Sequence, residues 1–147
     1  MATTFTADQA QQNWPALNAD EAGDVIAVRG AYSLTAALVI NDVIEMCKIP
    51  AQHTVVDVIL DCDDLDTGTP AIVLSVGYAG SGNSAKFIAA STAAQAGGIA
   101  RMDVATRFAP VNTDTKVVVK VTTAPATGTT TGIIGVTVLV CPAQNLD

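Results

Sequence analysis

Residues 43–79 constrain the fold most strongly, because three apolar segments there are separated by two breaks that a helix could not cross. The first break is the sequence KIPAQ, which contains Pro50, and the second is the acidic turn DCDDLDTGTP, which ends in Pro70. Proline and clusters of Asp, Gly and Thr punctuate strands, and the segments between them are rich in β-branched residues. The pattern predicts antiparallel β-structure.

The size and composition of the chain define its core. A chain of 147 residues forms one domain with a real hydrophobic core. Half of the residues are apolar but only 4% are aromatic, so the core must consist of Val, Ile, Leu and Ala. That mixture, together with abundant Thr, suits strands.

The net charge of −7 argues against some partners. An acidic protein repels phosphate backbones, so we expect no nucleic-acid partner. The basic residues are dispersed, and Lys116 with Lys120 on one side of an expected strand is interpreted as a solvated strand face. No apolar run approaches the ~20 residues that span a bilayer, so we expect no membrane partner.

The first 23 residues differ from the rest, and we interpret 1–23 as an N-terminal arm or leader and 24–147 as the β-sandwich domain. A short helix over Ala7–Asn13 would end before Pro15. Trp14, the one tryptophan of the chain, could anchor the arm on its own domain or on a neighbouring subunit. No secretory signal is visible in MATTFTADQAQQ, so we expect a protein that folds in a cytosol.

About eight strands are expected between residue 24 and the C-terminus, from nine candidate segments. The segments are 24–34 (bulged or bent at Gly30), 37–40, 43–49, 53–62, 70–78, 86–90, 99–104, 116–124 and 132–141, with one helical turn at 91–98. A helix over 34–48 is the local alternative, which the β-branched residues disfavour. The last strand is apolar on both faces, which predicts a central position in its sheet.

Alternation along these strands predicts which side chains face the core. The inward set is Val56, Val58, Leu60, Leu74, Val76, Val117, Val119, Val121, Val136 and Val138. The fold class is therefore all-β, an antiparallel β-sandwich of about eight strands. Jelly-roll and immunoglobulin-like orders both remain open, although the missing Cys…Trp…Cys framework argues mildly against the second.

No constellation of residues predicts catalysis, a cofactor or a metal ion, so no catalytic, cofactor-binding or metal residue is assigned. The acidic run Asp61–Asp66 fails as a calcium-binding EF-hand loop, because Leu65, Asp66 and Ile72 stand where the loop needs other residues. We interpret it as a turn whose Asp side chains cap backbone N–H groups, with a weak calcium site shared with a neighbouring subunit as the alternative.

Three further features are interpreted as structural. Cys47, Cys62 and Cys141 are odd in number and lack C-x-x-C spacing, so we expect reduced thiols that are mostly buried. His53, the one histidine, is expected to be exposed at a loop-to-strand junction rather than paired with a cysteine nucleophile. Residues 77–82 lack a phosphate-loop pattern and are interpreted as a strand-to-turn corner.

Three segments resemble a family of small virion proteins of tailed bacteriophages, the head decoration or cement proteins. They are NDVIEMCKIPA, LDCDDLDTGTPAIVLSVG and FIAASTAAQAGGIARMD, and the terminal strand IIGVTVLVC is also similar. The resemblance implies a jelly-roll-like domain without enzymatic activity that sits on the capsid exterior and locks adjacent capsomers. It also implies synthesis in the host bacterial cytoplasm. It implies the major capsid protein as partner, and self-association, commonly as a trimer.

Other virion roles remain open beside this one. A carbohydrate-binding sandwich, or a tail or head-completion module of a phage virion, would use the same fold. A sugar platform needs exposed aromatic rings, and the available Trp14, Tyr32 and Tyr78 are scattered along the chain.

Overall fold

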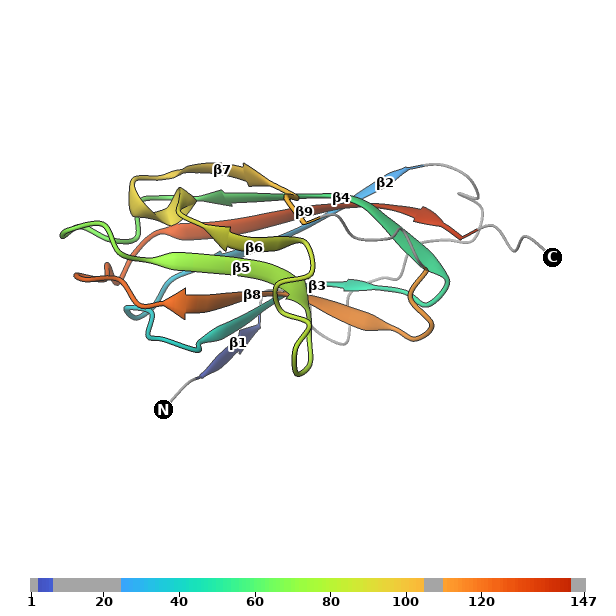
Figure 1. The fold of residues 1–147 in the computed structure, drawn as a ribbon, viewed down its shortest axis with the longest axis horizontal. Helices are drawn as coiled ribbons and strands as arrows, with labels where there is room; N and C mark the ends of the chain where they lie inside the picture. Colours follow the sequence, from blue (N-terminus) through green and yellow to red (C-terminus); the bar gives the residue numbers. More distant parts are fainter. Residues whose placement is uncertain (1–2, 7–24, 105–109, 144–147) are drawn as a thin grey trace.

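The computed structural model describes residues 3–6, 25–104 and 110–143, which form a sandwich of two sheets (Figure 1). The four-stranded sheet has the order β2 (Ile26–Ser33), β9 (Ile133–Pro142), β4 (His53–Cys62) and β7 (Gly98–Arg101). The five-stranded sheet has the order β1 (Thr4–Thr6), β3 (Val43–Ile49), β8 (Thr115–Thr123), β5 (Val73–Tyr78) and β6 (Ile88–Ser91). The predicted all-β sandwich is confirmed.

The antiparallel strand pairs are nested within one another along the chain. Strand β5 pairs with β6, β4 with β7, β3 with β8 and β2 with β9, so the chain folds back on itself about the β5–β6 connection. The predicted central position of the last strand is confirmed, because β9 lies between β2 and β4.

Strand β1 adds a ninth strand and a parallel pair, neither of which the sequence predicted. Thr4–Thr6 pair in parallel with Val43–Glu45 at the edge of the five-stranded sheet. The Phe5 ring packs on the Tyr32 ring of β2, with centroids 5.4 Å apart, so β1 also bridges to the other sheet. The predicted helix over Ala7–Asn13 and the predicted anchor Trp14 lie outside the described residues.

The core between the sheets is almost entirely aliphatic, as predicted. Nine of the ten side chains predicted to face inward are fully buried, at 0% exposure: Val58, Leu60, Leu74, Val76, Val117, Val119, Val121, Val136 and Val138. At about 25 cal/mol per Å² of apolar surface buried, this core is the main stabilising contribution to the fold.

The tenth predicted inward residue, Val56, is wrong, because its side chain is 36% exposed. A β-bulge between Val55 and Asp57 shifts the register of β4 against β9, so two residues there oppose one. The bulge turns Val55 inward, where it is 4% exposed, and leaves Val56 on the outer face. After the bulge the alternation resumes with Val58.

The predicted strand over 37–40 is also wrong, because these residues belong to the loop between β2 and β3. Asn41 adopts a positive φ of 69°, which confirms the predicted turn at Asn41-Asp42. Buried Asp42 accepts hydrogen bonds from the backbone N–H groups of Val39 (2.9 Å) and Thr3 (2.8 Å). The helical alternative for 34–48 is wrong as well, since Val43–Ile49 form β3.

Gly30 does not mark a bulge, since β2 and β9 pair in unbroken register through it. The reason for the glycine is a close approach between the sheets. A Cβ atom at this position would lie 2.1 Å from the carbonyl oxygen of Met46 in β3, so any residue larger than glycine would clash with β3.

The shorter predicted elements between residues 86 and 104 are present. The predicted strands at 86–90 and 99–104 appear as β6 and β7, each of four residues. The predicted helical turn is a 3-10 turn at Ala93–Gln95, and it ends before Gly97, which has a φ of +75°.

Candidate functional site

The outer face of the four-stranded sheet carries two ion pairs. Arg29 on β2 contacts both carboxylate oxygens of Asp61 on β4, at 2.5 and 2.7 Å, and also donates to Thr137 Oγ1 at 3.1 Å. The hydrogen bond with Asp61 raises the pKa of Arg29 above its ordinary value. Arg101 on β7 forms an ion pair with Asp57 on β4 through one contact, from Nη2 to Oδ2.

Glycine allows the first of these pairs to lie flat across β9. A Cβ atom at Gly135 would lie 2.4 Å from Arg29 Nη2 and 2.6 Å from the carboxylate oxygens of Asp61. The pair spans β2 to β4 above Gly135 of β9. The side chains of Arg29 and Asp61 are 50% and 33% exposed, so the pair contributes little to stability.

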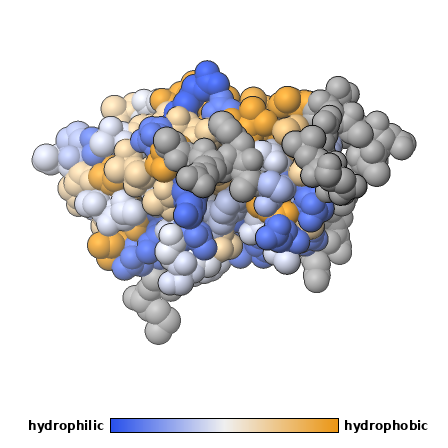
Figure 2. All heavy atoms as spheres, turned by 45° about the vertical axis from the view of Figure 1, so that its right-hand side comes forward, coloured by the Kyte–Doolittle hydropathy of each residue, from blue (hydrophilic) through white to orange (hydrophobic). Residues whose placement is uncertain are grey.

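Large apolar side chains are exposed at several places on the described surface. They are Val25, Val39, Ile40, Val56, Ile99 and Ile133, of which Ile99 on β7 is the most exposed at 73%. In the space-filling view, hydrophobic residues of the visible face occur in separate groups between hydrophilic ones (Figure 2). Such a surface offers contact points for a partner without forming one large apolar patch.

The acidic run Asp61–Asp66 is a set of backbone caps, as interpreted from the sequence. Asp66 is only 2% exposed, and its carboxylate accepts four backbone N–H groups at 2.8–3.1 Å, from Ala71, Ile72, Ala126 and Thr127. These bonds, first of all the one from Thr127, lower the pKa of Asp66 to about 2. The carboxylate thereby fastens the loop after β4 to the loop between β8 and β9.

The rest of the acidic run is also engaged with protein groups. Asp63 accepts the N–H of Ile133 at 2.8 Å, Asp64 accepts the N–H of Asp66 at 3.1 Å, and Asp61 holds Arg29. Within residues 3–6, 25–104 and 110–143, no group of three His, Cys, Asp or Glu side chains is arranged to hold a metal ion. The geometry favours the capping interpretation over the calcium alternative.

The three cysteines are free thiols. Cys47 and Cys62 are buried, and burial raises the pKa of each thiol to about 12, while Cys141 is half-buried. A thiol with so high a pKa is a poor nucleophile at neutral pH. His53 begins β4 and is half-buried rather than exposed, with its Nδ1 3.0 Å from the carbonyl oxygen of Ala51.

The corner at residues 77–82 follows the interpretation from the sequence. The N–H of Tyr78 donates to the carbonyl oxygen of Asn83 at 2.9 Å, and Gly80 and Gly82 have positive φ angles of 114° and 77°. The loop that follows folds back closely over β5. A Cβ atom at Gly77 would lie only 2.1 Å from the carbonyl oxygen of Asn83, so glycine is needed at this position.

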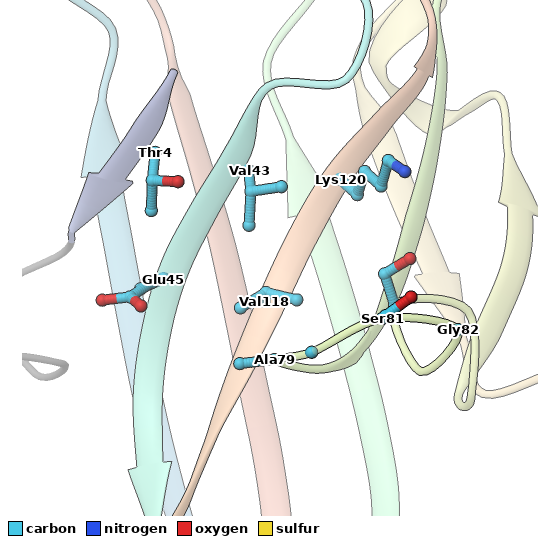
Figure 3. A pocket seen from close by; sticks show the side chains of 10 residues that line it. Thr4, Val43, Glu45, Ala79, Ser81, Gly82, Val118 and Lys120 are labelled. Atoms are coloured by element: carbon cyan, nitrogen blue, oxygen red, sulfur yellow. The ribbon is translucent and has the colours of Figure 1, made fainter. Parts of the chain in front are cut away.

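This loop bounds a groove that sequence reasoning missed, on the outer face of the five-stranded sheet (Figure 3). The groove has a volume of about 360 Å³. Val43 and Glu45 of β3 line it together with Val118 and Lys120 of β8, between Thr4 of β1 and the loop 79–84. Val118 lies on the outer face with Lys116 and Lys120 but is only 1% exposed.

Comparison with solved structures relates the whole chain to phage capsids. A chain in the capsid of Ralstonia phage GP4 is similar with a TM-score of 0.85 and 32% identity, over 97% of this chain and 99% of that one. A chain of the cyanophage Pam1 capsid asymmetric unit is similar with a TM-score of 0.70 and 29% identity, over 91% and 95%.

A third structure is similar in fold alone. It is a chain in the acid-stable capsid of Helicobacter pylori bacteriophage KHP30, with a TM-score of 0.56 and 15% identity over 81% of this chain and 89% of that one. No family model matches the chain, and no curated protein sequence matches it either.

The class of protein is therefore a structural β-sandwich of a phage virion. The chain belongs to the family of phage capsid proteins that includes the chain from Ralstonia phage GP4. The resemblance seen in the sequence to small phage virion proteins is confirmed. Within the described residues, no helix is long and apolar enough to cross a membrane.

Proposed function

We propose that the protein is a decoration (cement) protein, which binds the outside of the assembled phage head and stabilises contacts between capsomers. The observation that carries the proposal is the end-to-end match with a phage capsid chain. The match leaves almost nothing of either chain unaligned, so that capsid contains a separate chain of this size and fold.

The charge supports a position on the exterior. The net charge of −7 would repel packaged DNA at the inner surface of a head, whereas it is favourable for solubility at the outer surface. A rigid module with contact points at its surface, and without a catalytic group, is sufficient for this role. We therefore propose that the protein is not an enzyme, and that its partner is the major capsid protein of a tailed phage.

The strand order supports a jelly-roll classification for β2–β9. These eight strands form two four-stranded layers, with β2 beside β9 and β3 beside β8. A long hairpin that wraps around a sandwich gives this strand order. Viral capsid domains use this arrangement, and β1 extends one of the layers.

The glycan-binding alternative has less support. The aromatic side chains in the described part of the chain are half-buried or buried: Phe5 packs with Tyr32, and Tyr78 with Phe87 at a centroid distance of 4.8 Å. None of the four offers the exposed ring on which a sugar stacks. A tail or head-completion role uses the same fold, and a binding experiment separates it from decoration.

The test is co-sedimentation of the purified protein with undecorated capsids of its phage. A decoration protein sediments with the capsids and saturates at a fixed stoichiometry, whereas a tail or head-completion protein leaves them bare or binds at a few copies. Light scattering of the free protein tests the proposed trimer, and a strict monomer would refute that part.

The N-terminal segment remains a candidate for contact with a neighbour. Residues 4–6 form β1, so a truncation of the whole leader would also remove a strand. Trp14→Ala avoids that problem. If Trp14 anchors the arm on a neighbouring subunit, the variant binds capsids more weakly while its melting temperature stays within about 2 °C of the wild type, as for a substitution outside the core.

A further inference from the structure

The two sheets of the sandwich carry different charges. The strands of the four-stranded sheet contain two arginines and two aspartates, which form the ion pairs Arg29–Asp61 and Arg101–Asp57. The five-stranded sheet with its loop 79–86 contains four lysines and one glutamate: Lys48, Lys86, Lys116, Lys120 and Glu45. In a protein of net charge −7, this sheet is locally basic.

Three of these lysines share the outer face of the sheet. On β8, Lys116 and Lys120 alternate with Val117, Val119 and Val121, which are buried in the core. Lys48 of β3 lies directly opposite Lys116 in the register of the two strands. Lys86 belongs to the loop that folds over β5 on the same side, at Gly77.

Among the described residues, the single acid on this face neutralises only one lysine. Glu45 Oε2 accepts hydrogen bonds from Lys116 Nζ at 2.6 Å and from Thr6 Oγ1 at 3.2 Å. The acids at the strand ends, Asp42 and Asp114, are engaged with backbone N–H groups. Lys48, Lys86 and Lys120 therefore have no carboxylate partner within the part of the chain that the structure describes.

The groove on this face lies beside one of the unpaired lysines. Lys120 lines it, and Val118 and Val43 lie beside Lys120 with apolar side chains (Figure 3). The buried hydroxyl of Ser75, the register partner of Lys120 on β5, has no hydrogen-bond partner among the described residues. The outer face thus combines unpaired cations with an apolar floor between β1 and the loop.

We propose that the outer face of the five-stranded sheet docks a carboxylate-bearing segment of a shell protein, with Lys48 and Lys120 as its main charged contacts. The inference rests on the proposed decoration function and identifies the surface that serves it. An acidic segment complements the local charge, and an apolar side chain of the same segment can lie on Val118 and Val43.

A nucleic acid fits the groove less well. Strand recognition uses aromatic side chains for stacking and arginines for phosphate, and the described residues of the groove include neither. The lysine pair Lys116 and Lys120, interpreted from the sequence as a solvated strand face, becomes part of this docking surface.

The test uses the full-length chain with two matched variants. Lys48→Gln with Lys120→Gln removes two positive charges from the five-stranded sheet. Ala27→Glu with Ala31→Glu adds two negative charges beside Arg29 on the outer face of the four-stranded sheet. Each variant lowers the net charge from −7 by two, to −9, so the pair separates the effect of position from that of total charge.

Co-sedimentation with undecorated capsids at low and at high salt is the first measurement. We expect the lysine variant to bind about tenfold more weakly with a smaller salt dependence, while the control binds like the wild type. Equal binding of the lysine variant and the wild type overturns the inference but leaves the decoration function intact. If the wild type itself fails to bind, the proposed function fails, and the inference falls with it.

Carbodiimide cross-linking of the capsid-bound protein, read by mass spectrometry, identifies the occupant. This reagent joins an amine to a carboxylate in direct contact. Cross-links from Lys48 or Lys120 to a shell protein support the inference, whereas cross-links only to another copy of this chain, or none, overturn it. A gel shift of duplex DNA by the wild type that the lysine variant abolishes would also overturn it.

Discussion

The bulge in β4 makes a sharp prediction about two neighbouring valines. Val56 and Val58 would share a face in a regular strand, but the bulge places Val58 in the core at 0% exposure and Val56 on the surface at 36%. Val58→Ala removes two buried methyl groups, each worth about 0.8 kcal/mol, and leaves a cavity. We expect the free energy of unfolding to fall by about 2–3 kcal/mol.

Val56→Ala is the matched control, because the same atoms are removed two residues earlier. Its effect on the free energy of unfolding should stay within about 0.5 kcal/mol, as for a surface substitution. Urea titrations followed by circular dichroism give both values. In calorimetry, the Val58 variant should melt about 5–10 °C lower than the wild type, given about 2–4 °C per kcal/mol for a chain of this length.

The result that would refute the reasoning is a similar loss of stability in the two variants. That outcome would mean that β4 is regular and that both side chains are buried. A larger loss for Val56→Ala than for Val58→Ala would reverse the assignment of the two faces.

Three other predictions concern single groups. The pKa of Asp66 is about 2, below its ordinary value, so the ionised carboxylate stabilises the fold above about pH 4 and this contribution is lost as the pH falls toward 2. Asp66→Asn should therefore lower the melting temperature at pH 6. It should also make the melting temperature fall less steeply between pH 4 and pH 2 than it does in the wild type. In the folded protein at pH 8, a thiol-alkylating reagent should label Cys141 first and spare the buried Cys47 and Cys62. Labelling of Cys47 and Cys62 at the same rate as Cys141 would contradict their burial. Ser75→Ala should raise the free energy of unfolding by up to about 1 kcal/mol, because it removes a buried hydroxyl that has no hydrogen-bond partner among the described residues. A loss of stability would contradict this.

The sequence was sufficient for the strands whose alternation is unbroken. In β8, Val117, Val119 and Val121 alternate with Lys116, Val118, Lys120 and Thr122, and the structure buries the three inward valines in the core. The long apolar run of β9 indicated a central strand, because a strand that is apolar on both faces is buried on both faces.

The errors arise where the chain departs from a period of two. No residue type marks the bulge at Val55–Asp57, since its position depends on how β4 twists against β9. The apolar residues at 37–40 read as a strand, but Val39 and Ile40 are exposed at a loop whose shape depends on the contacts of Asp42. Strand β1 has three residues and gains its pairing only from β3.

The groove could not be predicted because its residues come together only through strand pairing. Glu45 and Val118 are 73 positions apart in the chain and become neighbours through the register of β3 and β8. The pattern of β8 did indicate that Lys116 and Lys120 share a face. It could not indicate that Lys48 joins them or that the loop 79–84 encloses the space beside them.

The central claim is that this sandwich decorates the outside of a phage head. Cryo-electron microscopy of the complete virion tests it most directly. The account predicts separate density for the sandwich on the outer surface of the head, with its five-stranded sheet turned toward the shell. Density for this chain inside the head, within the shell layer itself, or only at the tail would contradict the claim.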